Sequence, residues 1–357
     1  MTQFPDLIKI DGSQGEGGGQ ILRTAISLSG ITGKAVEVTN IRANRSNPGL
    51  RPQHLTGIKI IADLFHAEIE NLRIGADWIR FSPSDKFKGG SVKFDIGTAG
   101  SIPLILMTVV PAVSLSNNSL QIEVIGGTDV KASPTIDYVR HIVAESYRSI
   151  GVRFSVDILK RGYYPKGGGV VQSVIEPCRS PETIELLASR HIDPKIMSVC
   201  GQLPMHVAKR QISSALIALE KKEIQCTNYT ASIETSASPG SSILVYSASD
   251  FGPFVGGDSI GEPGKRAEFV GKEAAERFLE SMLSHAPVDP FLADMLVLPL
   301  ALSKGTSKYR IGRLTQHLLT NLHVASEIVG CKYSVVKQDK TYLVIIEGLN
   351  SAVKECC

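Results

Sequence analysis

A pattern of short apolar strand, glycine-rich turn and apolar helix recurs along this 357-residue chain. It begins with a strand over 7–11, a turn over 12–19 and a helix over 20–28, and it returns over 92–113 and 120–151. A related stretch closes the chain, running from the apolar segment 290–302 through a helix over 313–329. We interpret these stretches as degenerate internal repeats of one α/β unit.

The segment from about 182 to 269 differs in character from the repeats. It holds a helix, then Ser/Thr/Gly-rich runs typical of strands, and then the glycine-rich stretch FGPFVGGDSIGEPG. A second amphipathic helix follows over 265–280. This change in pattern predicts a small α/β domain inserted into the repeated body. With 43% hydrophobic residues the chain is long enough for a large core or for two domains.

The net charge argues against nucleic-acid binding over the whole surface, and the length of the apolar runs argues against a membrane-spanning helix. Lys plus Arg number 38 and Asp plus Glu 35, so the net charge of +3 predicts no nucleic-acid binding over the whole surface, and any such site must be a local patch. The longest apolar run, 102–113, contains two prolines and is shorter than the roughly 20 residues of a membrane span. No secretory signal is recognisable at the start, and we expect a cytoplasmic protein.

Six cysteines form no C-x-x-C pair and show no zinc-finger spacing with histidine. We expect buried free thiols, and whether any of them pair stays open.

His317 is predicted to lie in the first turn of the helix within 313–329, whose apolar stripe is Leu318, Leu322, Ala325 and Val329. The unpaired N–H groups and the positive dipole end of a first helical turn favour a neutral imidazole and attract an anion such as phosphate. Neutral imidazole is the nucleophilic form. On this segment alone, a structural histidine is the favoured interpretation.

The glycine-rich turn GSQGEGGG follows a strand and precedes a helix, so it brings backbone N–H groups close to a bound anion. It is neither a Walker A loop nor a dinucleotide fingerprint. Glu16 within it would repel a phosphate unless a divalent cation lay between them, which makes it a candidate ligand for Mg²⁺ or Mn²⁺. The alternative is a flexible turn with a solvated glutamate.

A local basic patch lies on the proline- and glycine-broken loop 41–54. Arg42, Arg45, Arg51 and His54 occur there without an acidic residue. Arginine forks on a loop suit bidentate contact with phosphates, although a solvated basic loop is the alternative.

Six stretches together resemble the RNA 3′-terminal phosphate cyclase family, in order and over nearly the whole chain. They are IDGSQGEGGGQILR, IRANRSNPGLRPQHL, GGTDV, RGYYPKGGGVV, FLADMLVLPLAL and QHLLTNLHV. The runs GEGGGQILR and RG-x-x-P-x-GGG are specific to it. The resemblance implies three α/β repeats with a thioredoxin-like small domain inserted before the last repeat. We therefore expect a main domain over 1–183 and 276–357 and an insert over 184–275.

The resemblance also implies a ligase-type nucleotidyl transfer to RNA. His317 would attack the α-phosphorus of ATP, release pyrophosphate and hold AMP. The RNA 3′-phosphate would take the AMP, and the vicinal 2′-OH would then give a 2′,3′-cyclic phosphate and free AMP. Carried over by motif, the resemblance makes His317 the nucleophile and Glu16 the metal ligand, and it assigns Arg42 and Arg45 to the RNA phosphates. The residues that it assigns to the nucleotide are Phe291, Leu292, Ala293, Asp294, Met295, Arg23 and Gln53. Among these, Asp294 would accept a hydrogen bond from the sugar or the base.

Two departures from the family pattern and two rival functions accompany this interpretation. Met107 stands where bacterial relatives carry glutamine, and Phe291 stands where some carry tyrosine.

Cyclase-like ribosome-assembly proteins share the fold and bind RNA without adenylylating themselves. They lack the nucleophilic histidine, so His317 favours the enzyme. An enolpyruvyl-transfer enzyme built from similar repeats leaves the GEGGG turn and His317 without a role. The oligomeric state stays open, with a homodimer as one option.

Overall fold

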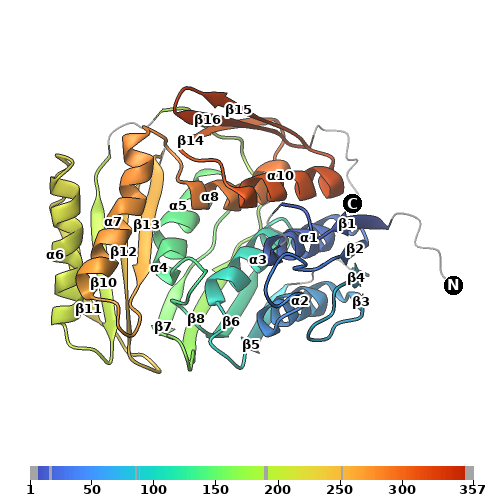
Figure 1. The fold of residues 1–357 in the computed structure, drawn as a ribbon. Helices are drawn as coiled ribbons and strands as arrows, with labels where there is room; N and C mark the ends of the chain where they lie inside the picture. Colours follow the sequence, from blue (N-terminus) through green and yellow to red (C-terminus); the bar gives the residue numbers. More distant parts are fainter. Residues whose placement is uncertain are drawn as a thin grey trace.

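A computed structural model of the chain describes residues 7–15, 18–84, 87, 89–188, 192–250 and 252–349. These residues form four four-stranded sheets with their helices (Figure 1). The α/β class predicted from the sequence is confirmed. Within the described ranges, no helix is both long and apolar enough to cross a membrane.

Three of the sheets share one topology. In each, the first two strands in chain order are parallel neighbours, and the fourth strand lies antiparallel between the second and the third. Parallel neighbours need a crossover connection, which explains why each turn between them leads into a helix. The repeat expected from the sequence is therefore visible in the strand order.

The three units divide the chain as follows. The first comprises β1 (Ile8–Asp11), α1 (Gly19–Thr32), β2 (Val36–Thr39), α2 (Pro52–Phe65), β3 (Glu68–Glu70) and β4 (Ile79–Ser82). The second comprises β5 (Gly90–Asp95), α3 (Ile102–Ser114), β6 (Leu120–Gly126), α4 (Ile136–Tyr138), the π-helical turn η1 (Val139–Val143), α5 (Ala144–Ser149), β7 (Asp157–Lys160) and β8 (Gly169–Ile175). The third comprises β9 (Glu185–Leu186), α8 (Pro290–Met295), α9 (Val297–Ala301), β14 (Thr306–Ile311), α10 (Gln316–Val329), β15 (Lys332–Gln338) and β16 (Thr341–Glu347).

The fourth sheet belongs to the segment between β9 and α8, which we call the insert. It comprises β10 (Lys195–Gly201), α6 (His206–Glu220), β11 (Asn228–Ile233), β12 (Gly240–Ala248), β13 (Phe254–Ile260) and α7 (Ala267–Leu283), in the sheet order β11-β10-β12-β13. Because β9 pairs in parallel with β14, the insert interrupts the last unit after its first strand instead of preceding that unit. The predicted boundaries, 184 and 275, stay a prediction.

Two hydrophobic cores match this division. One cluster of buried residues runs through the three units, while a separate cluster lies between the insert's sheet and its two helices. In the body, the sheets lie toward the outside and the helices of different units face one another in the middle (Figure 1). Helix α1 packs on α2, α3 and α10 there. The third unit thus closes directly onto the first.

Local signals set the ends of the helices that matter for the site. Helix α2 begins at Pro52, because proline suits a first helical position where its missing N–H is not needed. Helix α10 begins at Gln316 after Thr315, whose side chain accepts the N–H of Leu318 at 3.1 Å. Gly330 ends it in the left-handed conformation, with φ of 82°.

Candidate active site

His317 lies in the first turn of α10 and lines a cavity of about 410 Å³. Helix α1 supplies Gln20, Arg23 and Thr24 to the same cavity, and the basic loop supplies Arg45. The cavity therefore places the candidate nucleophile among cationic groups at the N-terminus of a helix, where an anion is stabilised.

Other walls of the cavity come from four parts of the chain. Helix α3 contributes Leu104, Met107 and Pro111, and α8 with the start of α9 contributes Phe291, Asp294, Met295 and Leu298. The second unit adds Ala132, Ser133, Pro134, Tyr138 and Tyr147, and the insert adds Asp258 and Arg277. All three units and the insert thus meet at one cavity, which only the complete fold forms.

Asp294 is a buried carboxyl that lacks a partner on one oxygen. Its Oδ1 has no hydrogen-bond partner in the part of the chain that the structure describes. Burial raises the pKa of Asp294 to about 8, with the positive charge of Arg23 opposing the shift and Asp289 adding to it. A carboxyl of this kind can accept from, or donate to, a sugar hydroxyl or a base edge.

Arg23 is the cationic counterpart of Asp294. Burial lowers the pKa of its guanidinium to about 10, while the carboxyl of Asp294 opposes that shift. Its Nη2 also donates to Oε1 of Gln20. Held in this way at the cavity wall, Arg23 presents a fixed positive charge to an anionic ligand.

Two hydrogen bonds fix the helices that carry these groups. Thr24 Oγ1 donates to Asn321 Oδ1 at 2.7 Å and so joins α1 to α10. Asn321 Nδ2 donates to the carbonyl of Asp294 at 3.0 Å and joins α10 to α8. Helix α10, which carries His317, is therefore hydrogen-bonded both to α1, which carries Arg23, and to α8, which carries Asp294.

The stretch 291–295 faces two ways. Phe291, 41% exposed, and Met295 line the cavity beside Asp294, whereas Leu292 and Ala293 are fully buried in the core. The carboxyl of Asp289 accepts the N–H groups of Phe291 and Leu292, both at 2.9 Å, and so caps α8. Of the five residues expected at the nucleotide, three therefore line the cavity and two support it from behind.

The predicted phosphate contacts occupy different positions. Arg45 lines the cavity of His317. Arg42 instead donates from Nη1 to the carbonyls of Asn47 at 2.5 Å and Gly49 at 3.2 Å, and so shapes the basic loop. Burial lowers the pKa of Arg42, and the nearby charges of Arg51 and Arg45 add to that effect.

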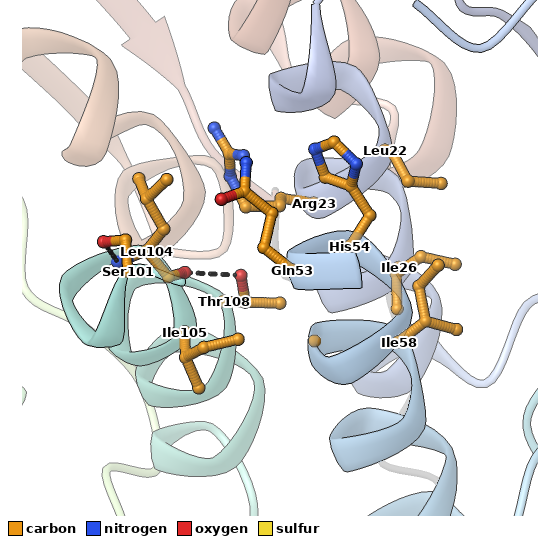
Figure 2. Close-up of a pocket in the computed structure, with 11 residues that line it drawn as sticks. Leu22, Arg23, Ile26, Gln53, His54, Ile58, Ser101, Leu104, Ile105 and Thr108 are labelled. Atoms are coloured by element: carbon orange, nitrogen blue, oxygen red, sulfur yellow. Dashed lines mark hydrogen bonds between the residues drawn. The ribbon is translucent and has the colours of Figure 1, made fainter. Parts of the chain in front are cut away.

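Gln53 lines a second, much smaller cavity of about 20 Å³ where α1, α2 and α3 meet, and Arg23 lines both cavities (Figure 2). His54 lies in the same small cavity, buried, and its Nδ1 accepts the N–H of Arg51 at 3.1 Å. Burial, with the charges of Arg23, Arg42 and Arg51, lowers the pKa of His54 to about 3. It is therefore a neutral, buried histidine and adds no positive charge to the basic patch.

Glu16 lies outside the described residues, but glycines on both sides of it are described. A side chain on Gly15, whose φ is 60°, would come within 2.5 Å of Thr320 Oγ1 in α10. A side chain on Gly18 would come within 3.1 Å of Arg45 Nη2. The turn thus approaches the helix of His317 and the basic loop closely. No group of three or more potential metal ligands occurs among the described residues.

The run RGYYPKGGG lies away from the cavity and joins the second unit to the insert. Arg161 is 1% exposed and its Nε donates to Glu234 Oε2 of the insert at 2.8 Å. The ring of Tyr163 packs on Gly240, where a Cβ would come within 2.1 Å of it. From the sequence, this run marked only the resemblance to the family.

Sequence reasoning also missed the cavity residues Tyr138, Tyr147, Asp258 and Arg277. No local motif marks them, because they reach the cavity only when the second unit and the insert pack against the first and third units. Met107 lines the cavity, so its thioether occupies the position at which the family resemblance led us to expect a glutamine.

Comparisons with known proteins agree on one family. Residues 14–335 match the sequence model of the family described as RNA 3′-terminal phosphate cyclase. The chain is 40% identical over 344 residues to a protein of that name from Pyrobaculum aerophilum, with 96% of this chain and 98% of that protein covered. A protein of the same name from Archaeoglobus fulgidus is 41% identical over 341 residues, with 95% and 100% covered. A solved structure, the enolpyruvyl transferase NikO from Streptomyces tendae, shares 9% identity over 97% of this chain and 49% of that one, at a TM-score of 0.39.

Proposed function

The chain belongs to the RNA 3′-terminal phosphate cyclase family, and on that premise we propose that it cyclises RNA 3′-phosphates through AMP bound covalently to His317. The observation that carries the proposal is the position of His317, in the first turn of α10 and on the wall of a cavity that also holds Arg23, Arg45 and Asp294.

The reaction balances in three displacements. A ring nitrogen of His317 attacks the α-phosphorus of ATP, and the bond from that phosphorus to the β-phosphate oxygen breaks to release pyrophosphate. An oxygen of the RNA 3′-phosphate then attacks the same phosphorus, and the P–N bond breaks. Finally the 2′-OH attacks the RNA phosphorus, loses its proton and displaces AMP. Covalent catalysis splits one difficult step into easier ones.

The described residues suit these steps. Arg23 and Arg45 supply fixed positive charge for the phosphoryl oxygens, which is the largest aid that a protein offers to phosphoryl transfer. Phe291 presents a ring face for the adenine, and Asp294 offers its free oxygen to the sugar or base. Arg42, Gln53, Leu292 and Ala293 would act by shaping the walls behind these groups.

Glu16 would hold a divalent cation next to the phosphates. The close approach of Gly15 to α10 and of Gly18 to Arg45 supports this placement, because both flank Glu16 in the chain. Bound there, the cation would neutralise phosphate charge.

The rival function, RNA binding in ribosome assembly without catalysis, does not require a histidine at this cavity. A labelling experiment separates the two. The protein is incubated with ATP labelled at the α-phosphate and Mg²⁺ or Mn²⁺, denatured and counted, with His317→Ala alongside. His323→Ala is the matched control, because His323 lies in the same helix but does not line the cavity.

We expect acid-labile label on the wild type and on His323→Ala, and none on His317→Ala. An RNA with a 3′-phosphate, but not one with a 3′-hydroxyl, should then discharge the label and become cyclic. Wild-type protein that stays unlabelled with either metal, while folded, contradicts the proposal and favours the assembly function.

A further inference from the structure

A further cavity of about 170 Å³ lies between the loop 130–135 of the second unit and the insert; we call it the insert-side cavity. Strand β13 and helix α7 form its other wall. Ala132, Ser133, Asp258 and Arg277 line both this cavity and that of His317, so the two adjoin. A ligand that fills the cavity of His317 can therefore extend into this one.

Positive and negative side chains are balanced in the insert-side cavity. Its cations are Lys131, Lys265 and Arg277, and its carboxyls are Asp258, Glu262 and Glu273. The triphosphate of a nucleotide, with several negative charges, would need an excess of cations. A unit with one negative charge and several hydroxyls fits this lining better.

The cation at the mouth is available to a ligand. Lys131 is 79% exposed at its side chain, and its Nζ pairs with Glu262 Oε2 of the insert at 3.0 Å. Exposed pairs of this kind contribute about 1 kcal/mol or less. An incoming phosphodiester can therefore compete with Glu262 for the ammonium group. Lys265, by contrast, is only 25% exposed and is held by Glu273 and Ser259.

The residue between the two cavities has an uncommon backbone conformation. Ala132 has a φ of 59°, in the left-handed region that costs a residue with a Cβ roughly 1 kcal/mol or more. Strain of this kind persists where the surrounding structure imposes it, and it concentrates at functional sites. Here it shapes the wall that both cavities share.

Hydroxyl groups complete the lining. Ser133, Thr135 and Ser259 stand among the charged side chains. Each nucleotide within an RNA chain brings one phosphodiester charge, one 2′-hydroxyl and a base edge, and carboxylates and hydroxyls recognise the last two.

From this geometry we propose that the insert-side cavity binds the RNA nucleotide that precedes the 3′-terminal one, with Lys131 at the phosphodiester between them. The inference rests on the proposed function. It gives the insert a direct part in holding the RNA.

Opposite charge changes on one ion pair test the proposal. Lys131→Glu and Glu262→Gln are compared with Lys272→Glu, a control on α7 whose side chain is 56% exposed and lines neither cavity. The measurements are labelling of the protein by ATP and the KM for a 3′-phosphorylated oligoribonucleotide.

Lys131→Glu should raise that KM about tenfold and Glu262→Gln should lower it, since the latter releases Lys131. Labelling should stay unchanged in both variants. A neutral methylphosphonate at the last linkage of the RNA should raise the KM of the wild type but lower that of Lys131→Glu, where it removes the repulsion between the introduced carboxylate and the phosphodiester.

The outcomes separate the two proposals. Wild-type protein that is neither labelled nor active on RNA refutes the proposed function. Active protein in which Lys131→Glu keeps the wild-type KM, or in which both variants weaken RNA binding alike, refutes the subsite alone.

Discussion

Arg161 donates from Nη1 and Nη2 to the two carboxylate oxygens of Asp137, at 2.8 and 3.0 Å, with both side chains buried. The same guanidinium contacts Asp129 at 3.3 Å and Glu234 of the insert at 2.8 Å. The loop between Asp129 and Asp137 lines both cavities. One buried cation therefore holds that loop against the insert.

Replacement of Arg161 by methionine should lower the free energy of unfolding by about 3–5 kcal/mol, because it leaves buried carboxylates without their counter-charge. The control is Arg210→Met, which breaks an equally well-aligned bidentate pair with Glu268. The side chain of Arg210 is 46% exposed, so its loss should cost about 1 kcal/mol or less. Urea denaturation compares the two. Asp137→Asn offers a milder break should Arg161→Met not fold. Equal losses at both arginines would contradict the view that Arg161 organises this junction.

Gly271→Ala and Gly57→Ala should change stability in opposite directions. In α7, a Cβ at Gly271 would lie 1.9 Å from the carbonyl oxygen of Gln211, so α6 and α7 must separate at a cost of about 1–3 kcal/mol. In α2, a Cβ at Gly57 would meet Ile105 at 3.5 Å, an ordinary contact, and alanine favours a helix by about 0.5–1 kcal/mol. Thermal unfolding of both variants measures this. Similar melting temperatures for the two would show that α6 and α7 do not pack this closely.

Thr315→Ala should reduce the labelling rate of His317 and cost about 1 kcal/mol of stability. The hydroxyl caps α10 through the N–H of Leu318, and its loss frees the first turn, in which His317 lies. Thr315→Ser keeps the hydroxyl and serves as the conservative control. If the alanine variant labels as fast as the serine variant, the cap has no part in positioning His317.

Asp294→Asn should gain stability relative to the wild type as the pH rises. The pKa of this carboxyl is raised from 3.8 in the unfolded chain to about 8 in the folded protein. Between those values the folded protein binds the proton that the unfolded chain has lost, so the contribution of Asp294 to the free energy of unfolding falls as the pH rises. The amide does not titrate.

Urea midpoints for both proteins at about pH 5 and about pH 9 give the measurement. The exposed Asp63→Asn variant controls for general charge effects. A difference between Asp294→Asn and the wild type that does not change with pH would contradict the raised pKa.

The fold class and the helix of His317 could be predicted because their signals are local. The apolar stripe of α10 follows from residues spaced within three turns, and the cap Thr315 accounts for the start at Gln316 in place of Arg313. Arg313 lies before the helix, and its Nε donates to Glu280 Oε1 at 2.5 Å. Most of the nucleotide and phosphate residues came only from the resemblance.

The junction and the cavity walls could not be predicted, since their partners are far apart in sequence. Asp137 and Glu234 lie 24 and 73 residues from Arg161. Asp258 and Arg277 reach the cavity through the docking of the insert, and no periodicity specifies docking. The two-residue strand β9 leaves no strand signal in the sequence, so its pairing with β14 across the insert could not be predicted.

The hydrogen bond from Thr24 to Asn321 spans 297 residues. During synthesis, helix α1 emerges from the ribosome long before α10, the helix on which it packs. The N–H of Ile184, just before β9, likewise donates to Ser307 Oγ, 123 residues later in the chain. A nascent or truncated chain without the last unit thus has Arg23 and Arg45 but lacks both His317 and the cavity wall formed by α8. Under the proposed function, a chain that lacks the final unit would therefore not consume ATP.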